Sequence, residues 1–418
     1  MGAVLDLAER CWNGDLVGKS TGLLRPTFET EEIAPGLVFL QGFANVSALR
    51  TAAGLLLVDT GAWLSAGRSF EAIRRVERGP VHSAVYTHGH VDHAFGLPPF
   101  LAEASERGWP RPRIIAHRNV SARFDRYRRT RGYNACINAR QFSLPRGLDW
   151  PERYDYPDLD YDDALCLEVG DEAFELRHAR GETDDHTWIW WPARRALFTG
   201  DQFVWVTPNA GNPQKAQRYP DAWAESLRAM EALGADVLVP GHGPPILGAA
   251  RVRQALAETA EWLEALVRDT LERMNAGEPL DAILHEVRPP AHLADRPWLQ
   301  PVYDDPEYVV RNVWRLYGGW YDGTPAHLRP AREAEIGREV ARLAGGAEVL
   351  ARRARELLDA GEARLAGHLA DWAALAAPES REVHRLRAEI YEARAARAPA
   401  LMTKGVFGSA ARESREKA

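Results

Sequence analysis

Short apolar runs that end in polar residues recur through the first part of the chain. Residues 54–61 (GLLLVDTG), 196–201 (ALFTGD) and 237–243 (VLVPGHG) hold continuous apolar stretches, which are typical of strands buried on both faces. Residues 174–178 (FELRH) instead alternate between apolar and polar side chains, which predicts a strand with one exposed face. Because these runs are too short for helices, the pattern predicts a β-rich unit whose strands end in polar loops.

Helical spacing replaces this pattern in the rest of the chain. Residues 308–317 have apolar side chains at helical spacing, and residues 333–395 are rich in Ala, Arg, Glu and Leu at the same spacing. Glycines and a proline interrupt the second stretch, which predicts antiparallel helical hairpins. The proline-rich residues 288–306 predict a linker. We therefore expect a sheet-containing catalytic domain over residues 1–285 and a linker with a helical domain over residues 286–418.

Composition places the chain among ordinary globular proteins. It has 418 residues, of which 45% are hydrophobic and 27% are charged, and its net charge is −7. The negative balance gives no sign of a nucleic-acid-binding surface. Three cysteines without paired spacing fit a reducing compartment, and neither a signal-peptide core nor an apolar run of about 18 residues is present. We expect a cytoplasmic protein that binds neither nucleic acid nor membrane.

Four metal-capable side chains lie within residues 87–93 (THGHVDH), directly after a predicted buried strand. His88 and His90 are two positions apart on extended chain, so they point the same way and can share one ion. Asp92 and His93 then turn away and can hold a second ion. Imidazole and carboxylate ligands favour Zn²⁺, with Mn²⁺ and Fe as alternatives. A surface loop that is merely rich in histidine is the competing interpretation, but clusters at ligand spacing are rare without a metal role.

The HxHxDH pattern of residues 88–93 resembles the signature of the metallo-β-lactamase superfamily. The resemblance implies an α+β fold, a four-layer αβ/βα sandwich, with a binuclear metal site. Asp201 (in FTGD) and His242 (in PGHG) match further elements of the superfamily, in which the Asp bridges both metals and the His completes the ligands. Asp59 (in DTG) matches a residue that supports the metal loop or one of its ligands.

The chain departs from the superfamily pattern at residues 179–186 (ARGETDDH). The superfamily reads GHTxG(H/S) here, and Glu182 takes the place of the expected histidine, with His186 four residues later. We expect Glu182 to replace that histidine as a ligand, and His186 to act as a proton donor or to support a ligand. The predicted metal ligands are therefore His88, His90 and Glu182 for one ion, Asp92, His93 and His242 for the other, and Asp201 between them.

A second resemblance covers residues 303–325 and the string TPAHLRP that follows RLYGGWYDG. These residues are similar to the dimerisation domain of alkyl sulfatases. In that family carboxylates also replace some of the usual metal ligands, so Glu182 points to the same branch. The resemblance implies a homodimer formed through the helical domain. We expect the sterol-carrier-like C-terminal domain of that family to be missing from this chain.

Two stretches supply candidate substrate contacts. Residues 118–150 are rich in Arg, interleaved with Tyr and Phe, and form either a solvated helix face or a cationic lid over an anionic substrate. Gly132 interrupts the helical pattern there and could aim the next side chains inward. Residues 207–219 carry cations that can clamp an anionic ester. The candidate substrate-binding residues are Tyr133, Asn134, Asn209, Asn212, Lys215 and Arg218.

These features predict a metal-dependent hydrolase with two divalent ions. The pKa of water that is shared by two ions falls from about 15.7 toward about 7, which gives a bridging hydroxide at neutral pH. No side-chain nucleophile is therefore required. Asp92 and Asp201 are the candidate catalytic residues around that hydroxide. The expected substrate is a small anionic ester, with sulfate esters as one hypothesis and a lactone, thioester or phosphoester as the alternative. A metal-stabilised scaffold without activity and oxygen chemistry on a single iron are the remaining hypotheses.

Overall fold

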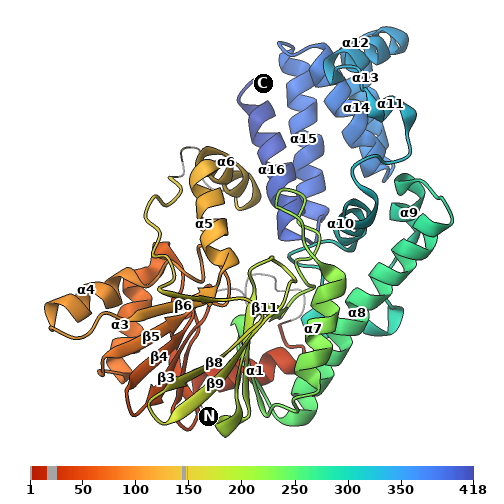
Figure 1. The fold of residues 1–418 in the computed structure, drawn as a ribbon. Helices are drawn as coiled ribbons and strands as arrows, with labels where there is room; N and C mark the ends of the chain where they lie inside the picture. Colours follow the sequence, from red (N-terminus) through yellow and green to blue (C-terminus); the bar gives the residue numbers. More distant parts are fainter. Residues whose placement is uncertain (1, 17–25, 144–146, 148) are drawn as a thin grey trace.

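The computed structural model describes residues 2–16, 26–143, 147 and 149–418 of the chain. Within these residues two β-sheets lie face to face between layers of helices (Figure 1). The seven-stranded sheet contains, in spatial order, β1 (Thr30–Ala34), β2 (Leu37–Leu40), β3 (Val46–Thr51), β4 (Gly54–Val58), β5 (Val81–Val85), β6 (Arg113–His117) and β7 (Leu159–Tyr161). The six-stranded sheet contains β13 (Ile246–Leu247), β12 (Val237–His242), β11 (Ala196–Val204), β10 (Thr187–Trp191), β9 (Glu172–His178) and β8 (Ala164–Val169).

Both sheets combine antiparallel hairpins with parallel pairs. β1 to β4 are antiparallel neighbours, whereas β4 to β7 are parallel. In the second sheet β11 and β12 form the parallel pair. The carboxyl ends of parallel strands meet at one edge of a sheet, and loops there carry functional residues in folds of this type. Asp59 follows β4, the histidine-rich loop follows β5, and His242 is the last residue of β12. Asp201 lies within β11, and Glu182 lies between β9 and β10.

Apolar side chains fill three interiors, and this confirms the predicted four-layer αβ/βα sandwich. The first sheet packs against α3 (Ala66–Val76), α4 (Pro98–Glu106) and α5 (Asn119–Arg129) through residues such as Ile73, Phe100 and Phe124. The second sheet packs against α7 (Pro220–Glu231) and α8 (Ala249–Asn275) through Leu227 and Leu263. The interior between the sheets includes Phe39, Leu56, Val85, Phe174, Ile189 and Phe198.

The C-terminal part of the chain is helical, as the sequence predicted, and rises away from the sandwich in Figure 1. The interruptions near Gly345, Gly361 and Pro378 fall between helices, and Gly345 has a positive φ of 90° at the end of its helix. The helices are α9 (Leu280–Glu286), α10 (Pro306–Gly318), α11 (Pro325–Leu328), α12 (Glu333–Ala344), α13 (Ala347–Asp359), α14 (Ala363–Ala376), α15 (Arg381–Arg397) and α16 (Leu401–Arg415).

The predicted linker, residues 288–306, is packed rather than free. Trp298 is only 2% exposed and lies in the same hydrophobic cluster as Leu263 of α8 and Val313 of α10. The segment contains two short 3-10 helices, η3 (Ala291–Leu293) and η4 (Pro297–Leu299), and the apolar residues between the prolines anchor it to the sandwich. Since this cluster runs across residue 285, the domain boundary near that residue stays a prediction.

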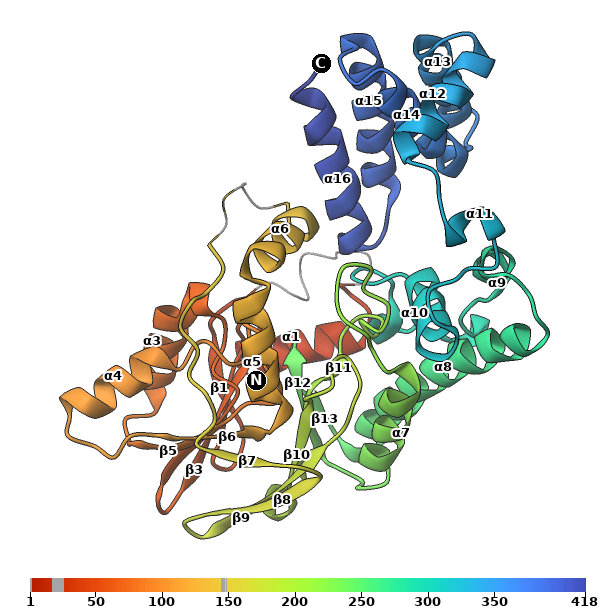
Figure 2. The same cartoon turned by 45° about the horizontal axis from the view of Figure 1, so that its top comes forward.

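Helix α6 (Arg131–Gln141) projects from the sandwich and lies beside α16 in both views (Figure 2). Gly405 of α16 faces the carbonyl of Gln141 so closely that an added Cβ would lie 1.9 Å from that oxygen. The helical domain therefore contacts the sandwich at α6 and at the cluster around Trp298, among other places. Among the described helices, none combines the length and apolar character that crossing a membrane requires.

Candidate metal centre

The histidine-rich loop follows β5, and Asp59, which follows β4, holds it in place. Asp59 has a positive φ of 54°, and this strained turn aims its carboxylate at the loop. Its Oδ1 accepts the backbone N–H of Thr87 at 2.7 Å, and its Oδ2 accepts the Thr87 hydroxyl at 2.8 Å. The same Oδ2 lies 2.7 Å from Nδ1 of His93. Asp59 therefore contacts both the backbone of the loop and one of its histidines.

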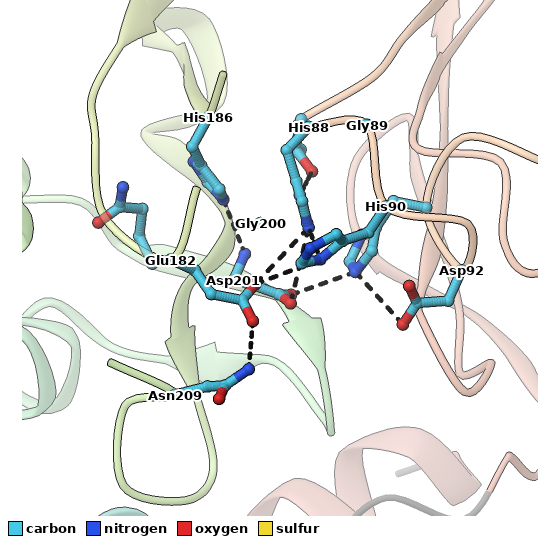
Figure 3. Close-up of polar contacts among 12 residues, drawn as sticks. His88, Gly89, His90, Asp92, Glu182, His186, Gly200, Asp201 and Asn209 are labelled. Atoms are coloured by element: carbon cyan, nitrogen blue, oxygen red, sulfur yellow. Dashed lines mark hydrogen bonds and ion pairs between the residues drawn. The ribbon is translucent and has the colours of Figure 1, made fainter. Parts of the chain in front are cut away.

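The structure brings together all seven side chains that the sequence proposed as ligands. Figure 3 labels His88, His90, Asp92, Glu182 and Asp201 among them. Within each of two groups the potential ligand atoms all lie within 4.8 Å of one another. Asp201 lies between the groups, because its Oδ1 is 3.3 Å from Nε2 of His93 and its Oδ2 is 3.8 Å from Nε2 of His88. One group is His88, His90, Glu182 and Asp201, and the other is Asp92, His93 and His242.

Hydrogen bonds at the back of the imidazoles fix which ring nitrogen faces the centre. Nδ1 of His93 contacts Asp59, and Nδ1 of His242 contacts the carbonyl oxygen of Phe43. A carbonyl oxygen only accepts, so Nδ1 of His242 carries the proton and Nε2 presents a lone pair. Nδ1 of His88 contacts the Thr87 hydroxyl, which already donates to Asp59, so this ring also presents Nε2. Such contacts orient imidazoles that bind metals.

Burial and neighbouring charges shift the pKa values of the titratable side chains in the two groups. Burial lowers the pKa of His88 and of His90 well below the usual value, and neighbouring cationic groups add to the effect. For His93 burial acts in the same direction, but the carboxylates of Asp201 and Asp59 outweigh it and raise the pKa well above the usual value. Burial raises the pKa of Glu182 to about 8, against the opposing effect of Arg218.

The donor set fits divalent cations. Oε2 of Glu182 and Oδ1 of Asp201 are buried and have no hydrogen-bond partner among the described residues. Nε2 of His88 lies 2.8 Å from Nδ1 of His90, and Nε2 of His93 lies 3.3 Å from Nε2 of His242. Buried carboxylate oxygens without donors and imidazole nitrogens that face one another are costly unless a cation lies between them. The donor atoms, nitrogen and carboxylate oxygen, are those that Zn²⁺ and similar ions accept.

Glu182 is held by two side chains from the loop after β11. Its Oε1 accepts the amide N–H of Asn209 and lies 3.2 Å from the Arg218 guanidinium, which also donates to the Glu182 carbonyl oxygen. Glu182 and Arg218 are 4% and 3% exposed, so the pair is shielded from water. This contact explains how a carboxylate can occupy the position where the resemblance leads one to expect histidine.

His186 lies behind the centre and does not line the cavity in front of it. Its Nε2 accepts the backbone N–H of Asp201 at 3.0 Å, and its ring stacks on that of His88. Burial lowers its pKa to about 3, so the ring is neutral with the proton on Nδ1. Of the two roles that the sequence suggested, this position favours support of Asp201 and offers His186 no path to donate a proton to a substrate.

Gly241 permits the close approach of β12 to Asp201. An added Cβ at this position would lie 2.2 Å from Oδ1 of Asp201. The glycine of the PGHG string therefore makes room for the carboxylate that sits between the two groups.

Arg123 reaches the metal loop from α5, where the sequence offered only a solvated face or a lid. It is 5% exposed, and its Nε donates to Oδ2 of Asp185 at 2.6 Å, while its Nη2 contacts Asp184. Oδ2 of Asp185 also accepts the backbone N–H of Gly89 at 3.1 Å. Arg123 thus acts on the loop through Asp185, and sequence spacing alone gave no sign of this pairing.

A cavity of about 350 Å³ opens in front of the two groups. His90, Asp92, Glu182, Asp201 and His242 form its floor. Among the other lining residues, hydrogen bonds connect several polar side chains, and ring contacts join Trp63, Trp150 and Tyr127. We call the polar set the polar side and the apolar set the apolar side. The polar side includes Asn138, Gln141, Asn209, Asn212, Lys215, Arg218 and Tyr303, and the apolar side includes Phe43, Trp63, Leu64, Val91, Tyr127, Phe142 and Trp150.

Four of the six candidate substrate-binding residues line this cavity, namely Asn209, Asn212, Lys215 and Arg218. The expectation for Tyr133 and Asn134 needs correction. Tyr133 is 61% exposed, and the amide of Asn134 donates to the Thr130 hydroxyl within its own helix. Gly132 does not break the helix, because α6 runs from Arg131 to Gln141 and turns Tyr133 outward.

Helix α6 instead presents Asn138 and Gln141 to the cavity, three positions apart on one face. Polar residues at positions 134, 138 and 141 on one helical face are a signal that the sequence contained. Tyr303, whose hydroxyl accepts an N–H of Gln141 at 3.1 Å, was also missed as a lining residue. It comes from the segment that leads into α10, and only tertiary structure brings it to the site.

Comparison with known families finds a match for each part of the chain. Residues 40–242 match the metallo-beta-lactamase superfamily, and residues 280–417 match the alkyl sulfatase dimerisation domain. A linear primary-alkylsulfatase of Pseudomonas sp. is 28% identical over 339 residues, which cover 76% of this chain and 62% of that protein. An (R)-specific secondary-alkylsulfatase of Pseudomonas sp. is 26% identical over 402 residues, which cover 86% of this chain and 58% of that protein. The chain therefore spans about three-fifths of the length of these curated relatives.

Solved structures show the same fold. The stereoselective inverting sec-alkylsulfatase of Pseudomonas sp. superposes with a TM-score of 0.85 at 24% identity, over 93% of this chain and 66% of that chain. The superposition includes both the sandwich and helices of the C-terminal part, since it covers nearly the whole chain. The fold expected from the sequence is thereby confirmed in both domains.

Proposed function

We propose that this chain, which joins a metallo-beta-lactamase superfamily domain to an alkyl sulfatase dimerisation domain, is a metal-dependent hydrolase of small anionic esters. The observation that carries the proposal is the convergence of seven potential ligands on the floor of a cavity with one cationic and one apolar side. Sulfate esters of alkyl alcohols fit that division best. The relatives named as alkylsulfatases support this choice of substrate.

Two divalent ions, with zinc favoured and manganese or iron as alternatives, would be held by this chain's own side chains. His88, His90 and Glu182 would hold one, Asp92, His93 and His242 would hold the other, and Asp201 would contact both. When bound, such ions supply Lewis acidity and lower the pKa of water from 15.7 toward about 7. Asp59 and the Phe43 carbonyl oxygen keep the imidazole nitrogens aimed at the ions.

The polar side of the cavity would bind the head of the substrate. Arg218 and Lys215 carry the positive charge, and Asn209 and Asn212 offer amide N–H groups. Lys215 donates to Oδ1 of Asn138 at 3.2 Å, and burial lowers its pKa to about 8. Nζ therefore holds a proton at neutral pH and can give it to the ester oxygen that leaves. Trp63, Trp150 and Phe43 would exclude water and receive the apolar part of the alcohol.

The helical domain would form a homodimer, as the match to the dimerisation domain suggests. Exposed apolar residues on this part of the chain, such as Trp320 (68% exposed) and Leu328 (55% exposed), are suitable for such an interface. Sedimentation of the purified protein gives its mass directly. Location in the cytoplasm stays a prediction from the composition and the first residues, and cell fractionation tests it.

Release of inorganic sulfate from an alkyl sulfate tests the proposal. The metal-loaded protein should release sulfate faster than it turns over lactones, thioesters or phosphate esters of the same alcohol. If the protein prefers a phosphate ester, the proposed metal centre would stand and the proposed substrate class would be wrong. A protein that holds metal but turns over nothing would be a scaffold, and the hydrolase proposal would fail.

A further inference from the structure

The cavity's polar side is built on the loop between β11 and α7, and this loop has little structure of its own. Residues 205–219 contain neither helix nor strand, yet Thr207, Asn209, Asn212 and Arg218 are all buried. Buried backbone groups in such a loop must find partners elsewhere. The partners come from residues 300–312, which lie in the part of the chain that matches the dimerisation domain.

One end of the loop is fixed by Asp304. Asp304 is fully buried, its Oδ2 accepts the backbone N–H of Gly211 at 2.7 Å, and its Oδ1 accepts the N–H of Asp305 at 2.8 Å. The backbone N–H of Thr207 donates to the Gln300 carbonyl oxygen at 3.1 Å. Gly211 itself presses on α10, where an added Cβ would lie 2.3 Å from the carbonyl carbon of Tyr308. The contact leaves no room for a side chain at position 211.

The other end of the loop is fixed by Asn312. Its amide Nδ2 donates to the carbonyl oxygen of Arg218 at 2.9 Å. Its own carbonyl and side-chain oxygens accept from Nε2 of Gln217 at 3.2 and 3.0 Å. Asn312 is 5% exposed, so these hydrogen bonds are shielded from water. Segment 300–312 therefore contacts the loop on both sides of its cavity-lining residues.

We propose that Asp304 and Asn312 are positioning residues that set the distance between Asn209 and Arg218, and through them the geometry of Glu182 and of the anion-binding side of the cavity. Asn209 and Arg218 are the two side chains that contact Oε1 of Glu182. The helical domain is thus part of the active site and not only a means of assembly. This inference rests on the proposed function for the identity of the anion.

The test compares three variants with the wild type. Asp304→Asn keeps the size of the side chain but places an NH2 group against one of two backbone N–H donors. Gly211→Ala disturbs the same contact from the side of the loop. Asn312→Ala removes the hydrogen bond to the Arg218 carbonyl oxygen and so releases that end of the loop. Asp371→Asn is the matched control, because that carboxylate contacts Arg387 and Tyr391 within the helical domain and nothing in the loop.

The probe is inorganic sulfate, whose dissociation constant is measured by calorimetry on the metal-loaded proteins. Loss of one of the two hydrogen bonds that Asp304 accepts predicts that Asp304→Asn binds sulfate about tenfold more weakly and has a KM about tenfold higher, with a smaller change in kcat. Hydrogen exchange of residues 207–218 should rise in all three variants, whereas exchange of residues 88–93 and the metal content should not change. Asp371→Asn should match the wild type in every measurement.

Two results would overturn the inference. Exchange in residues 207–218 equal to that of the wild type in Asp304→Asn and Asn312→Ala would show that segment 300–312 does not shape the loop. Faster exchange with unchanged sulfate binding and KM would show a merely structural contact. Failure of the proposed function is distinct, because the wild type itself would then neither bind sulfate nor hydrolyse an anionic ester, and the inference would fall with it.

Discussion

Replacing Glu182 with histidine restores the residue that the superfamily pattern leads one to expect, and we predict that it weakens the site. Imidazole is as good a zinc ligand as carboxylate. The substitution should lower the free energy of unfolding because it leaves Arg218 without its carboxylate partner. Arg218 is 3% exposed and makes no other ion pair in the described part of the chain. Removing one partner of a buried ion pair costs about 3–5 kcal/mol because the other charge stays buried. Asn209 would also lose the acceptor for its amide N–H.

In metal-free form, at a pH above 8 where Glu182 is ionised, Glu182→His should therefore unfold several degrees below the wild type. A competing chelator should also strip its metal more readily. Glu182→Gln, which keeps an oxygen acceptor but no charge, should lie between them. The double variant Glu182→His with Arg218→Met removes the uncompensated charge and should recover most of the lost thermal stability. Thermal unfolding and elemental analysis after chelator competition measure both effects. A Glu182→His protein as stable and as metal-retentive as the wild type would refute the dependence of Glu182 on Arg218.

Three further predictions concern the cavity and its support. Across linear alkyl sulfates, kcat/KM should rise about fourfold per added methylene, from about 0.8 kcal/mol for each buried CH2, and Trp63→Ala should flatten that series. Burial lowers the pKa of Lys215, which faces Arg218, Glu182, Asp92 and Arg126, to about 8. As the pH passes that value and Lys215 loses its proton, KM for an anionic ester should rise and kcat should fall. Lys215→Met should raise KM and lower kcat at pH 7 and remove this pH dependence. Arg123→Met should lower the unfolding temperature and the metal content by freeing Asp185, at a cost of about 3–5 kcal/mol, whereas Arg129→Met on the exposed face of the same helix should change neither.

Several of the candidate ligands could be found in the sequence because they lie at or just after the end of a strand. A buried strand is a short apolar run, and the residue after it lies at the edge of the sheet. His88 after β5 and His242 at the end of β12 are recognised in this way, and the structure brings both to one place. The pairing of Glu182 with Arg218 could not be read from the sequence, because 35 intervening residues separate the two along the chain while the fold sets their side chains 3.2 Å apart.

The residues that line the cavity were harder to predict, because the orientation of each side chain around its helix and the tertiary contacts determine which ones face it. Gly132 suggested a break that would aim Tyr133 inward, but the helix continues through this glycine, and Asn138 and Gln141 face the cavity instead. Prolines in residues 288–306 suggested a free linker, whereas the buried Trp298 and Asp304 anchor it. Glycine and proline report local backbone preference, and packing overrides that preference where apolar or paired polar side chains are buried.

Anomalous scattering from a crystal of the metal-reconstituted protein, recorded at the absorption edge of the added metal, tests the central claim most directly. We predict two strong peaks among the seven side chains, one beside His88, His90 and Glu182 and one beside Asp92, His93 and His242, with Asp201 touching both. An absence of peaks at this place, or peaks bound elsewhere on the chain, would contradict the account.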